Sequence, residues 1–321
     1  MAIGIGVIGT GKHGARYLRH VAEVPSVRLV ALCRRDREAG ARQAWESGCR
    51  FYPEPAELIA DPAVEAVVLV LPPTLNVRIA TAAARAGKAL LIEKPLAPTV
   101  ADCRRIADAA RDVPAMVAHT LRFNAVVQTL QAELAQIGPL HAAVLTQRFE
   151  PSPLAWLDRR TEAGGGIILH TGVHSFDLLR HLTGLEAERV SAEARRVATR
   201  ETEDNFAATI EMEGGSLLAM VAGSRATAGR CGAIELAGRD GQLVGDHVHG
   251  WAARLRGTSR VPLAVGAPVP TVPVTLAEFA AALRERRMPA ITLADGAASV
   301  ALAEACYRSI ASGRPEPVER W

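Results

Sequence analysis

Two histidines and an aspartate in the middle of the chain are spaced for one face of a helix. His170, His174 and Asp177 follow three consecutive glycines at 164–166, whose backbone can turn where side chains would block it. In a helix these polar residues stand at i, i+4 and i+7, so their side chains project from one face. Imidazoles and a carboxylate placed together can move protons. The same pattern also fits a buried helix whose histidines only form hydrogen bonds.

A second candidate site begins near the N-terminus, where residues 9–14 read Gly-Thr-Gly-Lys-His-Gly. The motif follows a predicted buried strand at 3–8 and precedes an amphipathic helix that ends before Pro25. In this context the glycines form a tight turn and let the backbone approach a pyrophosphate, which the helix N-terminus faces. We therefore predict a dinucleotide site formed by Gly9, Thr10, Gly11, Lys12, His13 and Gly14.

The next predicted strand, at 27–33, ends at two arginines rather than at an acid. NAD-binding folds usually place a carboxylate here, about twenty residues past the glycine motif, to bind the ribose 2′-hydroxyl. Arg34 and Arg35 follow the strand instead, and a guanidinium suits the 2′-phosphate of NADP. We predict NADP as the cofactor, with NAD possible. The alternative is that Asp36 binds the ribose, although its position favours a role as N-cap of the helix that follows.

Strands and helices continue to alternate as far as residue 121. Apolar runs at 64–71, 89–92 and 116–120 predict strands that are separated by helices. This alternation predicts an α/β Rossmann domain with a doubly wound parallel sheet, in which ligands bind at the carboxyl ends of the strands. Residues at two of these ends complete the predicted cofactor site: Leu71, Pro72, Asn76, Glu93 and Lys94.

From residue 122 onward the pattern changes to consecutive strands. Few helices separate them, so we predict an α+β domain with a large, mostly antiparallel open sheet. Gly214-Gly215 is a hairpin signal within it. We place the dinucleotide-binding domain at 1–121 and the second domain at 122–321. The predicted strands of the second domain are 140–149, 190–196, 206–212, 216–222 and 233–237.

The last quarter of the chain is predicted to contain one irregular stretch and two helices. Residues 246–273 carry four prolines and are predicted to be irregular. Amphipathic patterns predict helices at 276–286 and 295–312. Asp295 is the expected cap of the second helix, and Gly313 its end.

The composition excludes several classes of protein. The chain has 321 residues, 49% of them hydrophobic and 22% charged, with a net charge of +3, which fits a globular protein of about two domains. Its arginines are scattered among acids, so no nucleic-acid partner is predicted. Five widely spaced cysteines without a CxxC pair predict reduced thiols and a cytoplasmic location. We expect neither a signal peptide nor a membrane partner, because no basic n-region and no long apolar run is found.

Five motifs in a fixed order make the sequence resemble one family of enzymes. They are the N-terminal Gly-x-Gly-x-x-Gly, Glu93-Lys94-Pro95, Arg122-Phe123-Asn124, the glycine run followed by His174-x-x-Asp177, and Glu203-Asp204-Asn205. Together they are similar to the glucose–fructose oxidoreductase, inositol dehydrogenase and MocA-like (Gfo/Idh/MocA) family, over nearly the whole chain. The resemblance implies an N-terminal Rossmann domain and a C-terminal domain whose open sheet commonly forms a dimer or tetramer face. We therefore expect a homodimer or homotetramer.

The resemblance also implies roles for single residues. Lys94 matches the lysine that lies close to nicotinamide and substrate, and His174 matches the catalytic histidine. The family usually has aspartate where this chain has His170, and many members have histidine where it has Asn76. A second imidazole would not orient His174 or stabilise its protonated form as a carboxylate does. The catalytic set is then Lys94, His174 and His170, and substrate contacts are expected from Lys94, Arg122, Asn124, Trp156, His170 and His174.

The activity implied is oxidation or reduction of a sugar, a cyclitol or a related polyol. A hydride would pass between the nicotinamide and a carbinol carbon, which requires a group that takes the hydroxyl proton. His174 is the candidate base, and Lys94 would polarise the oxygen. The alternatives are a nicotinamide-dependent glycosidase and a non-catalytic dinucleotide-binding regulatory protein. No metal site is predicted at His170, His174 and Asp177, because the nicotinamide already supplies redox chemistry.

Overall fold

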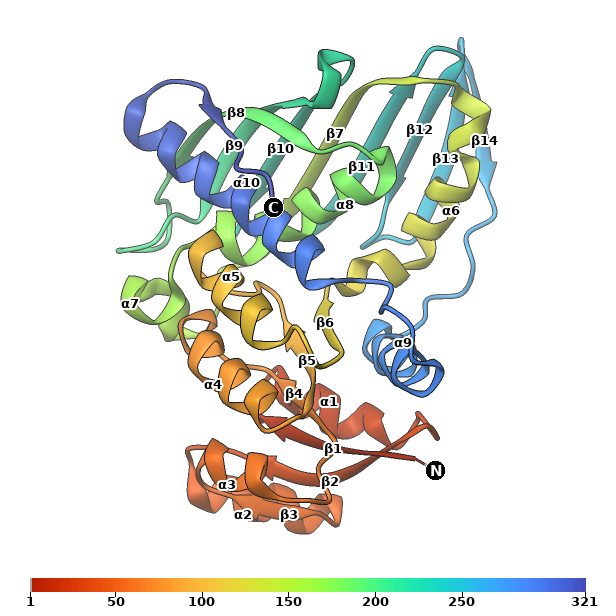
Figure 1. Cartoon of the computed structure of the whole chain (residues 1–321). Helices are drawn as coiled ribbons and strands as arrows, with labels where there is room; N and C mark the ends of the chain where they lie inside the picture. Colours follow the sequence, from red (N-terminus) through yellow and green to blue (C-terminus); the bar gives the residue numbers. More distant parts are fainter. Residues whose placement is uncertain (1) are drawn as a thin grey trace. The chain divides into compact units, whose positions relative to one another are not determined.

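The chain folds into two compact units, shown in the computed structural model of Figure 1, which describes residues 2–321. The first unit contains the residues up to Thr120 together with Pro270–Ala297; the second contains Leu121–Val269 and Ala298–Trp321. The first break lies one residue from the predicted domain boundary at 121/122. The sequence pattern does not predict the return of Pro270–Ala297 to the first unit, because an amphipathic helix has an apolar face whichever sheet it covers.

The first unit is built on a six-stranded parallel sheet in the order β3-β2-β1-β4-β5-β6. This order confirms the doubly wound Rossmann arrangement, with its switch point between β1 and β4. β4 and β5 are buried along their whole length, which explains their unbroken apolar sequences. The strands are β1 (Ile3–Ile8), β2 (Val27–Cys33), β3 (Arg50–Tyr52), β4 (Ala66–Leu69), β5 (Ala89–Glu93) and β6 (Ala115–Ala118).

The helices of this unit connect successive strands, and one comes from a later part of the chain. Helix α9 contacts α1 and β2, so a segment far along the sequence completes the packing around the Rossmann sheet. Asp36 caps α2, accepting the Ala39 N–H at 3.0 Å, as its position favours. The helices are α1 (Gly14–Val21), α2 (Arg37–Ser47), α3 (Pro55–Ala60), α4 (Pro73–Arg85), α5 (Val100–Ala109) and α9 (Thr271–Glu285).

The second unit is built on a nine-stranded sheet in the order β14-β13-β12-β11-β7-β10-β9-β8-β15. Every neighbouring pair is antiparallel except β7 with β10, which confirms the predicted mostly antiparallel sheet. The strands are β7 (Leu140–Arg148), β8 (Ala187–Arg195), β9 (Asn205–Met212), β10 (Leu218–Ser224), β11 (Cys231–Gly238), β12 (Gly241–Asp246), β13 (Trp251–Arg256), β14 (Ser259–Leu263) and β15 (Glu316–Pro317).

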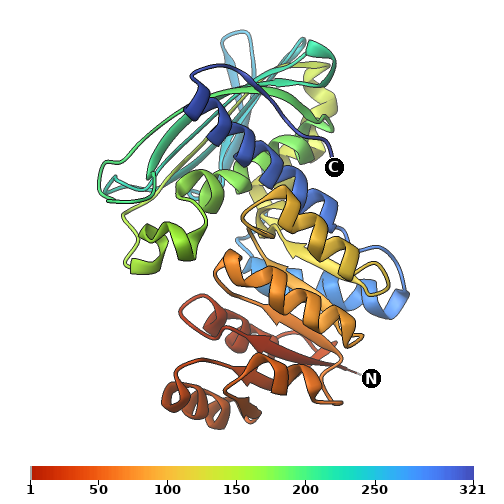
Figure 2. The same cartoon turned by 60° about the vertical axis from the view of Figure 1, so that its left-hand side comes forward.

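Helices cover one face of this nine-stranded sheet. α6 (Ala125–Glu133), α8 (Val173–Thr183) and α10 (Leu293–Ser312) lie along that face, and the opposite face carries none of the described helices (Figure 1; Figure 2). Burial alternates along β9 and β10 accordingly, with the buried residues of each strand turned toward the helices. The short α7 (Arg160–Ala163) precedes the glycine run.

Two expectations about the C-terminal part are wrong. The stretch 246–273 contains the hairpin of β13 and β14, joined at Gly257, rather than irregular structure throughout. The prolines and arginines of this stretch do not resemble a strand sequence. They are tolerated in β14 because it lies at the sheet edge, where Pro262 removes no hydrogen bond between interior strands. Helix α10 begins earlier than expected, because Thr292 Oγ1 accepts the Asp295 N–H while Asp295 accepts the Thr292 N–H. Asp295 is therefore the third helical residue of a capping box and not the cap itself.

None of the helices formed by residues 2–321 combines the length and the apolar character that crossing a lipid bilayer requires.

Candidate active site

The glycine motif between β1 and α1 has the geometry of a phosphate-binding turn. Gly9 has φ +97°, and a Cβ there would stand 2.2 Å from the Val70 carbonyl oxygen, so no other residue fits. Gly11 differs, because a Cβ built on it meets no atom within 4 Å. The protein itself leaves the space beside Gly11 open, which is the space that the pyrophosphate of a dinucleotide needs. The residues present therefore fit the predicted cofactor.

Arg34 lies against this turn at the end of β2. Its Nη1 donates a 3.1 Å hydrogen bond to the carbonyl oxygen of Thr10, which also accepts Gln43 Nε2 at 3.1 Å. The Thr10 side chain is buried and bonded to Gln43, so it supports the turn from inside. Arg35 is exposed, and Asp36 serves as helix cap. Of the groups at this strand end, the Arg34 guanidinium is the one held beside the glycine turn.

A buried carboxylate connects the glycine motif to the Glu93-Lys94-Pro95 segment at the end of β5. Glu93 Oε1 accepts hydrogen bonds from His13 Nε2 at 2.8 Å and from the Tyr17 hydroxyl at 2.6 Å. Glu93 Oε2 accepts the Lys94 N–H at 3.1 Å. Burial opposes ionisation of Glu93, but the charges of His13 and Lys94 and these hydrogen bonds outweigh it and lower its pKa to about 2. Burial, then the Glu93 charge, raises the pKa of Tyr17 well above its ordinary value.

The backbone that follows Lys94 is held from α4. Asn76 is almost fully buried, and its Nδ2 donates to the carbonyl oxygens of Pro95 at 3.3 Å and Leu96 at 3.0 Å. Lys94 is half-buried, and the Lys94–Pro95 peptide bond is cis. Leu71 and Pro72 are half-buried at the end of β4, immediately before α4 begins at Pro73. Asn76 therefore positions the segment that carries Lys94, a role that its type and place in the sequence do not reveal.

In the second unit, a buried carboxylate also holds the glycine run before His170. Glu203 Oε1 accepts the N–H groups of Gly166 at 3.0 Å and Ile168 at 3.2 Å, and the Tyr307 hydroxyl at 2.7 Å. A Cβ on Gly166 would stand 2.1 Å from the Glu203 carbonyl oxygen. Only glycine fits at position 166, because the backbone at Glu203 lies too close for a side chain. Burial, then the Glu203 charge, raises the pKa of Tyr307 well above its ordinary value.

The segment with the two histidines begins with a π turn, Ile168–Gly172, and continues as α8. His170 is buried, its Nε2 lies 2.9 Å from the Ala163 carbonyl oxygen, and its ring contacts the edge of Trp156 at a centroid distance of 5.5 Å. A carbonyl only accepts hydrogen bonds, so Nε2 carries a proton. His174 is half-buried in the first turn of α8. A π turn contains one more residue than a regular helical turn. It therefore changes the angle between the His170 and His174 side chains from the angle expected at i, i+4 positions of an α-helix.

Asp177 is engaged by an arginine. Its carboxylate is 1% exposed and accepts Arg122 Nη2 at 2.6 Å and Arg122 Nε at 2.9 Å. The Arg122 side chain is thus bonded to α8. Asn124 caps α6 by accepting the Val126 N–H at 2.9 Å. Within residues 2–321, no group of three or more His, Cys, Asp or Glu side chains is arranged to hold a metal ion.

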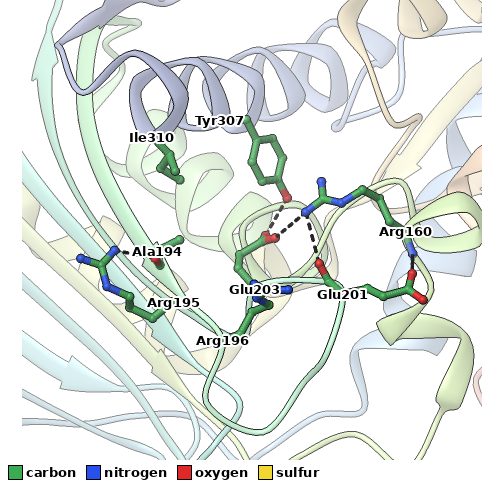
Figure 3. Close-up of a pocket in the computed structure, with 8 residues that line it drawn as sticks. All are labelled: Arg160, Ala194, Arg195, Arg196, Glu201, Glu203, Tyr307 and Ile310. Carbon is green, nitrogen blue, oxygen red and sulfur yellow. Dashed lines mark hydrogen bonds and ion pairs between the residues drawn. The ribbon is translucent and has the colours of Figure 1, made fainter.

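A cavity of about 600 Å³ lies in the second unit and is lined in part by Glu203, the carboxylate that holds the glycine run (Figure 3). The Glu203–Tyr307 pair forms part of its wall, and Arg160 reaches over both Glu203 and the Glu201 carbonyl (Figure 3). His174 does not line it. The cavity therefore lies next to the Glu203–Tyr307 pair, which holds the glycine run before the histidine segment. Its lining residues are Arg160, Ala194, Arg195, Arg196, Glu201, Glu203, Tyr307 and Ile310.

Comparison with known protein families decides what these two units are. A family described as "Oxidoreductase family, NAD-binding Rossmann fold" matches residues 3–120, and the GFO/IDH/MocA C-terminal domain matches residues 132–244. The chain belongs to the Gfo/Idh/MocA oxidoreductase family. It is therefore an NAD(P)-dependent oxidoreductase with a Rossmann cofactor domain.

Two relatives agree with this family, and a solved structure agrees with its fold. The chain is 30% identical to 1,5-anhydro-D-fructose reductase of Ensifer adhaerens over 98% of each protein. It is also 30% identical to inositol 2-dehydrogenase 2 of Saccharopolyspora erythraea, over 99% of this chain and 96% of that one. Its fold is similar to that of aldose-aldose oxidoreductase from Caulobacter crescentus, with a TM-score of 0.91, 24% identity and coverage of 99% and 100%.

Several residues around these sites are not singled out by the sequence reasoning. Tyr17 lies four residues after His13 on α1, so i, i+4 spacing from the motif is the signal that could have indicated it. Gln43 and Tyr307 offer no such signal, because they reach their partners from distant segments. Glu203 enters the sequence analysis only through the resemblance.

Proposed function

We propose that the protein oxidises or reduces a carbinol or keto carbon of a sugar, cyclitol or related polyol. The observation that carries this proposal is the connection between the glycine turn and Glu93-Lys94, since one buried carboxylate orders both the phosphate-binding loop and the segment with the candidate catalytic lysine. The named activities of the relatives, an anhydrofructose reductase and an inositol dehydrogenase, support this substrate class.

The chain's own residues supply binding and proton transfer in this proposal. A bound nicotinamide would accept or supply the hydride. The Lys94 ammonium would donate a hydrogen bond to the reacting oxygen and favour its charged form. His174 would take the hydroxyl proton during oxidation and return it during reduction, because an imidazole titrates near neutral pH. Since Nε2 of His170 is bonded to Ala163, we assign His170 and Trp156 to the wall beside the reacting group rather than to proton transfer.

We propose NADP as the preferred cofactor. Arg34 is held beside the glycine turn by its bond to the Thr10 carbonyl, and its 4.0 Å distance from Asp36 Oδ2 is too long for a close ion pair. A guanidinium in this place suits a 2′-phosphate. Asp36 is used as a helix cap, which weakens the alternative in which its carboxylate binds the ribose.

We also propose a homo-oligomer formed through the open face of the nine-stranded sheet. On β10, Leu218 and Met220 are 54% and 53% exposed, on the face opposite the helices. Large apolar side chains on an uncovered sheet face are typical of an interface. The family's use of this sheet for dimers or tetramers supports the same assignment.

The test is the absorbance of reduced nicotinamide when the protein is mixed with NADP or NAD and a panel of sugars, cyclitols and their keto forms. We expect turnover with at least one polyol pair, and a higher kcat/KM with NADP. Release of an aglycone from a glycoside without net reduction of the cofactor would replace the proposal by the glycosidase function. Tight cofactor binding with no turnover of any compound would replace it by the regulatory one.

A further inference from the structure

Arg225 is a half-buried cation beside the histidine segment, and it has no acidic partner among residues 2–321. Its Nε donates to Thr171 Oγ1 at 3.1 Å, and its guanidinium carbon lies 5.6 Å from the centre of the Phe149 ring. No carboxylate of residues 2–321 forms an ion pair with it. Burial, then the nearby charge of Arg230, lowers the pKa of Arg225. A partly desolvated charge without a partner is costly, and an anionic ligand would remove that cost.

The fold holds this guanidinium in a defined place. Arg225 directly follows β10, and its backbone N–H donates a hydrogen bond to the backbone carbonyl oxygen of Asp204 at 2.7 Å. Thr171 is buried in the π turn, so the Arg225–Thr171 bond fixes the side chain against that turn. Because Nε is used, the two terminal nitrogens keep their N–H groups for an acceptor outside the described residues. Those nitrogens form the edge with which arginine binds a carboxylate or phosphate through two parallel hydrogen bonds.

The position relative to His174 indicates what the anion belongs to. Thr171 precedes His174 by three residues in the continuous segment formed by the π turn and the first turn of α8, so their Cα atoms are at most about 10 Å apart. An anion on Arg225 would therefore lie beside the segment that carries His174. The neighbouring cation Arg230 is exposed and already paired with Glu150 at 2.7 Å, so it does not compete for the same anion.

We propose that Arg225 is a specificity-determining residue that binds the anionic group of an acidic sugar or polyol. The substrate class is then a sugar acid or a sugar phosphate, with the carboxylate or phosphate on Arg225 and the reacting carbinol at His174. This inference rests on the proposed function for the reacting group, whereas anion binding by Arg225 stands apart from turnover. The thioether variant Arg225→Met keeps length without charge, and Arg225→Lys keeps charge without the two-pronged edge.

Binding and turnover are measured for matched neutral and acidic compounds. Calorimetry with the cofactor-saturated protein compares D-glucose with D-glucuronate and D-glucose 6-phosphate, and D-glucitol with D-gluconate. We expect an acid to bind at least tenfold more tightly than its neutral counterpart. We expect Arg225→Met to lose about thirtyfold or more of that affinity, as when one partner of a desolvated charge pair is removed, while neutral compounds change by less than about threefold. Which acid binds better distinguishes carboxylate from phosphate.

Controls separate this inference from a structural role and from the proposed function. Arg230→Met, in the same loop, should keep the preference for acids, and Arg225→Lys should retain part of it. Equal loss of affinity for acids and neutral compounds in Arg225→Met, or a wild-type preference for neutral compounds, would overturn the inference. Selective loss of cofactor affinity would assign the anion to the dinucleotide instead. If acids bind through Arg225 but none is turned over, the binding site stands and the proposed reaction fails.

Discussion

The Tyr17 hydroxyl and the Glu93 carboxylate are joined by a 2.6 Å hydrogen bond in the interior of the Rossmann unit. Tyr17 is fully buried on α1, and Glu93 ends β5, so the bond ties the helix after the glycine motif to the strand before Lys94. His13 completes the group from the motif itself. The cofactor loop and the lysine segment are therefore one structural element, although 80 residues separate His13 from Glu93 in the sequence.

Replacing Tyr17 by phenylalanine should destabilise the protein. The change leaves the buried Glu93 carboxylate without one donor, which costs about 1–3 kcal/mol. The measurement is the free energy of unfolding in urea. Tyr52→Phe is the matched control, because the Tyr52 hydroxyl donates to Asp61 at 3.1 Å, and Asp61 keeps its ion pair with Arg50. An equal loss of unfolding free energy in both variants would show that the Tyr17–Glu93 hydrogen bond stabilises the protein no more than the Tyr52–Asp61 bond does.

The same carboxylate gives the stability a dependence on acid pH. The pKa of Glu93 is lowered from 4.5 to about 2, so its contribution is fully present above about pH 4.5 and is lost as the pH falls toward 2. His13→Leu should therefore cost more stability at pH 5 than at pH 3, by about 1–2 kcal/mol. Urea unfolding of wild type and variant at both pH values measures the difference. A cost independent of pH would contradict the assignment of the low pKa to this pair.

Replacing Arg34 by alanine should reduce the preference for NADP. Loss of one charge-assisted contact to a 2′-phosphate is expected to lower kcat/KM with NADP about 10- to 100-fold and to leave the value with NAD nearly unchanged. Arg42→Ala is the control, because Arg42 is an exposed arginine whose nearest acid, Glu38, lies one turn away on α2. An unchanged ratio of the two cofactors in Arg34→Ala would remove Arg34 from the cofactor site.

His174→Asn should abolish most turnover and spare the cofactor site. Loss of a general base typically lowers kcat by about 10²- to 10⁴-fold. Cofactor affinity, measured by fluorescence titration, should stay within about twofold, because the residues predicted to bind the dinucleotide all precede residue 121. His181→Asn, two turns further along α8, is the matched control and should retain activity. Normal turnover in His174→Asn would exclude it as the base.

Gly166→Ala should be far more damaging than the same change at Gly229. A Cβ at Gly166 would stand 2.1 Å from the Glu203 carbonyl oxygen, whereas one at Gly229 meets nothing within 4 Å. We expect a loss of about 1–3 kcal/mol or more at Gly166 from forced overpacking, with turnover reduced because the segment leading to His174 moves. Urea unfolding and kcat are compared for the two variants. Equal stability would show that the glycine turn is free to relax.

Much of the fold follows from local patterns in the sequence. The unbroken apolar runs of β4 and β5 and the glycine motif after β1 determine the Rossmann unit, because each is a local signal of strand or turn. β3 has only three residues, too few to show the alternation of apolar and polar side chains that indicates a strand. The hairpin of β13 and β14 is hidden by prolines and charges that are tolerated at a sheet edge.

The partners of the candidate site residues are less accessible from the sequence. Arg122 and Asn124 are predicted at the substrate, and the structure adds their partners within the chain, with Arg122 bonded to Asp177 and Asn124 capping α6. A polar side chain looks the same in the sequence whether it faces a ligand or another segment of the chain. Only the three-dimensional arrangement separates Arg122, which has a carboxylate partner, from Arg225, which has none in the part of the chain that the structure describes.

The π turn at Ile168–Gly172 determines which side chains the histidine segment offers to its surroundings. Each residue of a regular α-helix advances by about 100°, so one inserted residue rotates everything before it relative to everything after it. Deleting a single residue here would turn His170 away from Ala163 and Thr171 away from Arg225 while α8 kept its own contacts. The inserted residue thus sets the angle between the two halves of the same helix, and a one-residue deletion would change which side chains the first half presents to its surroundings.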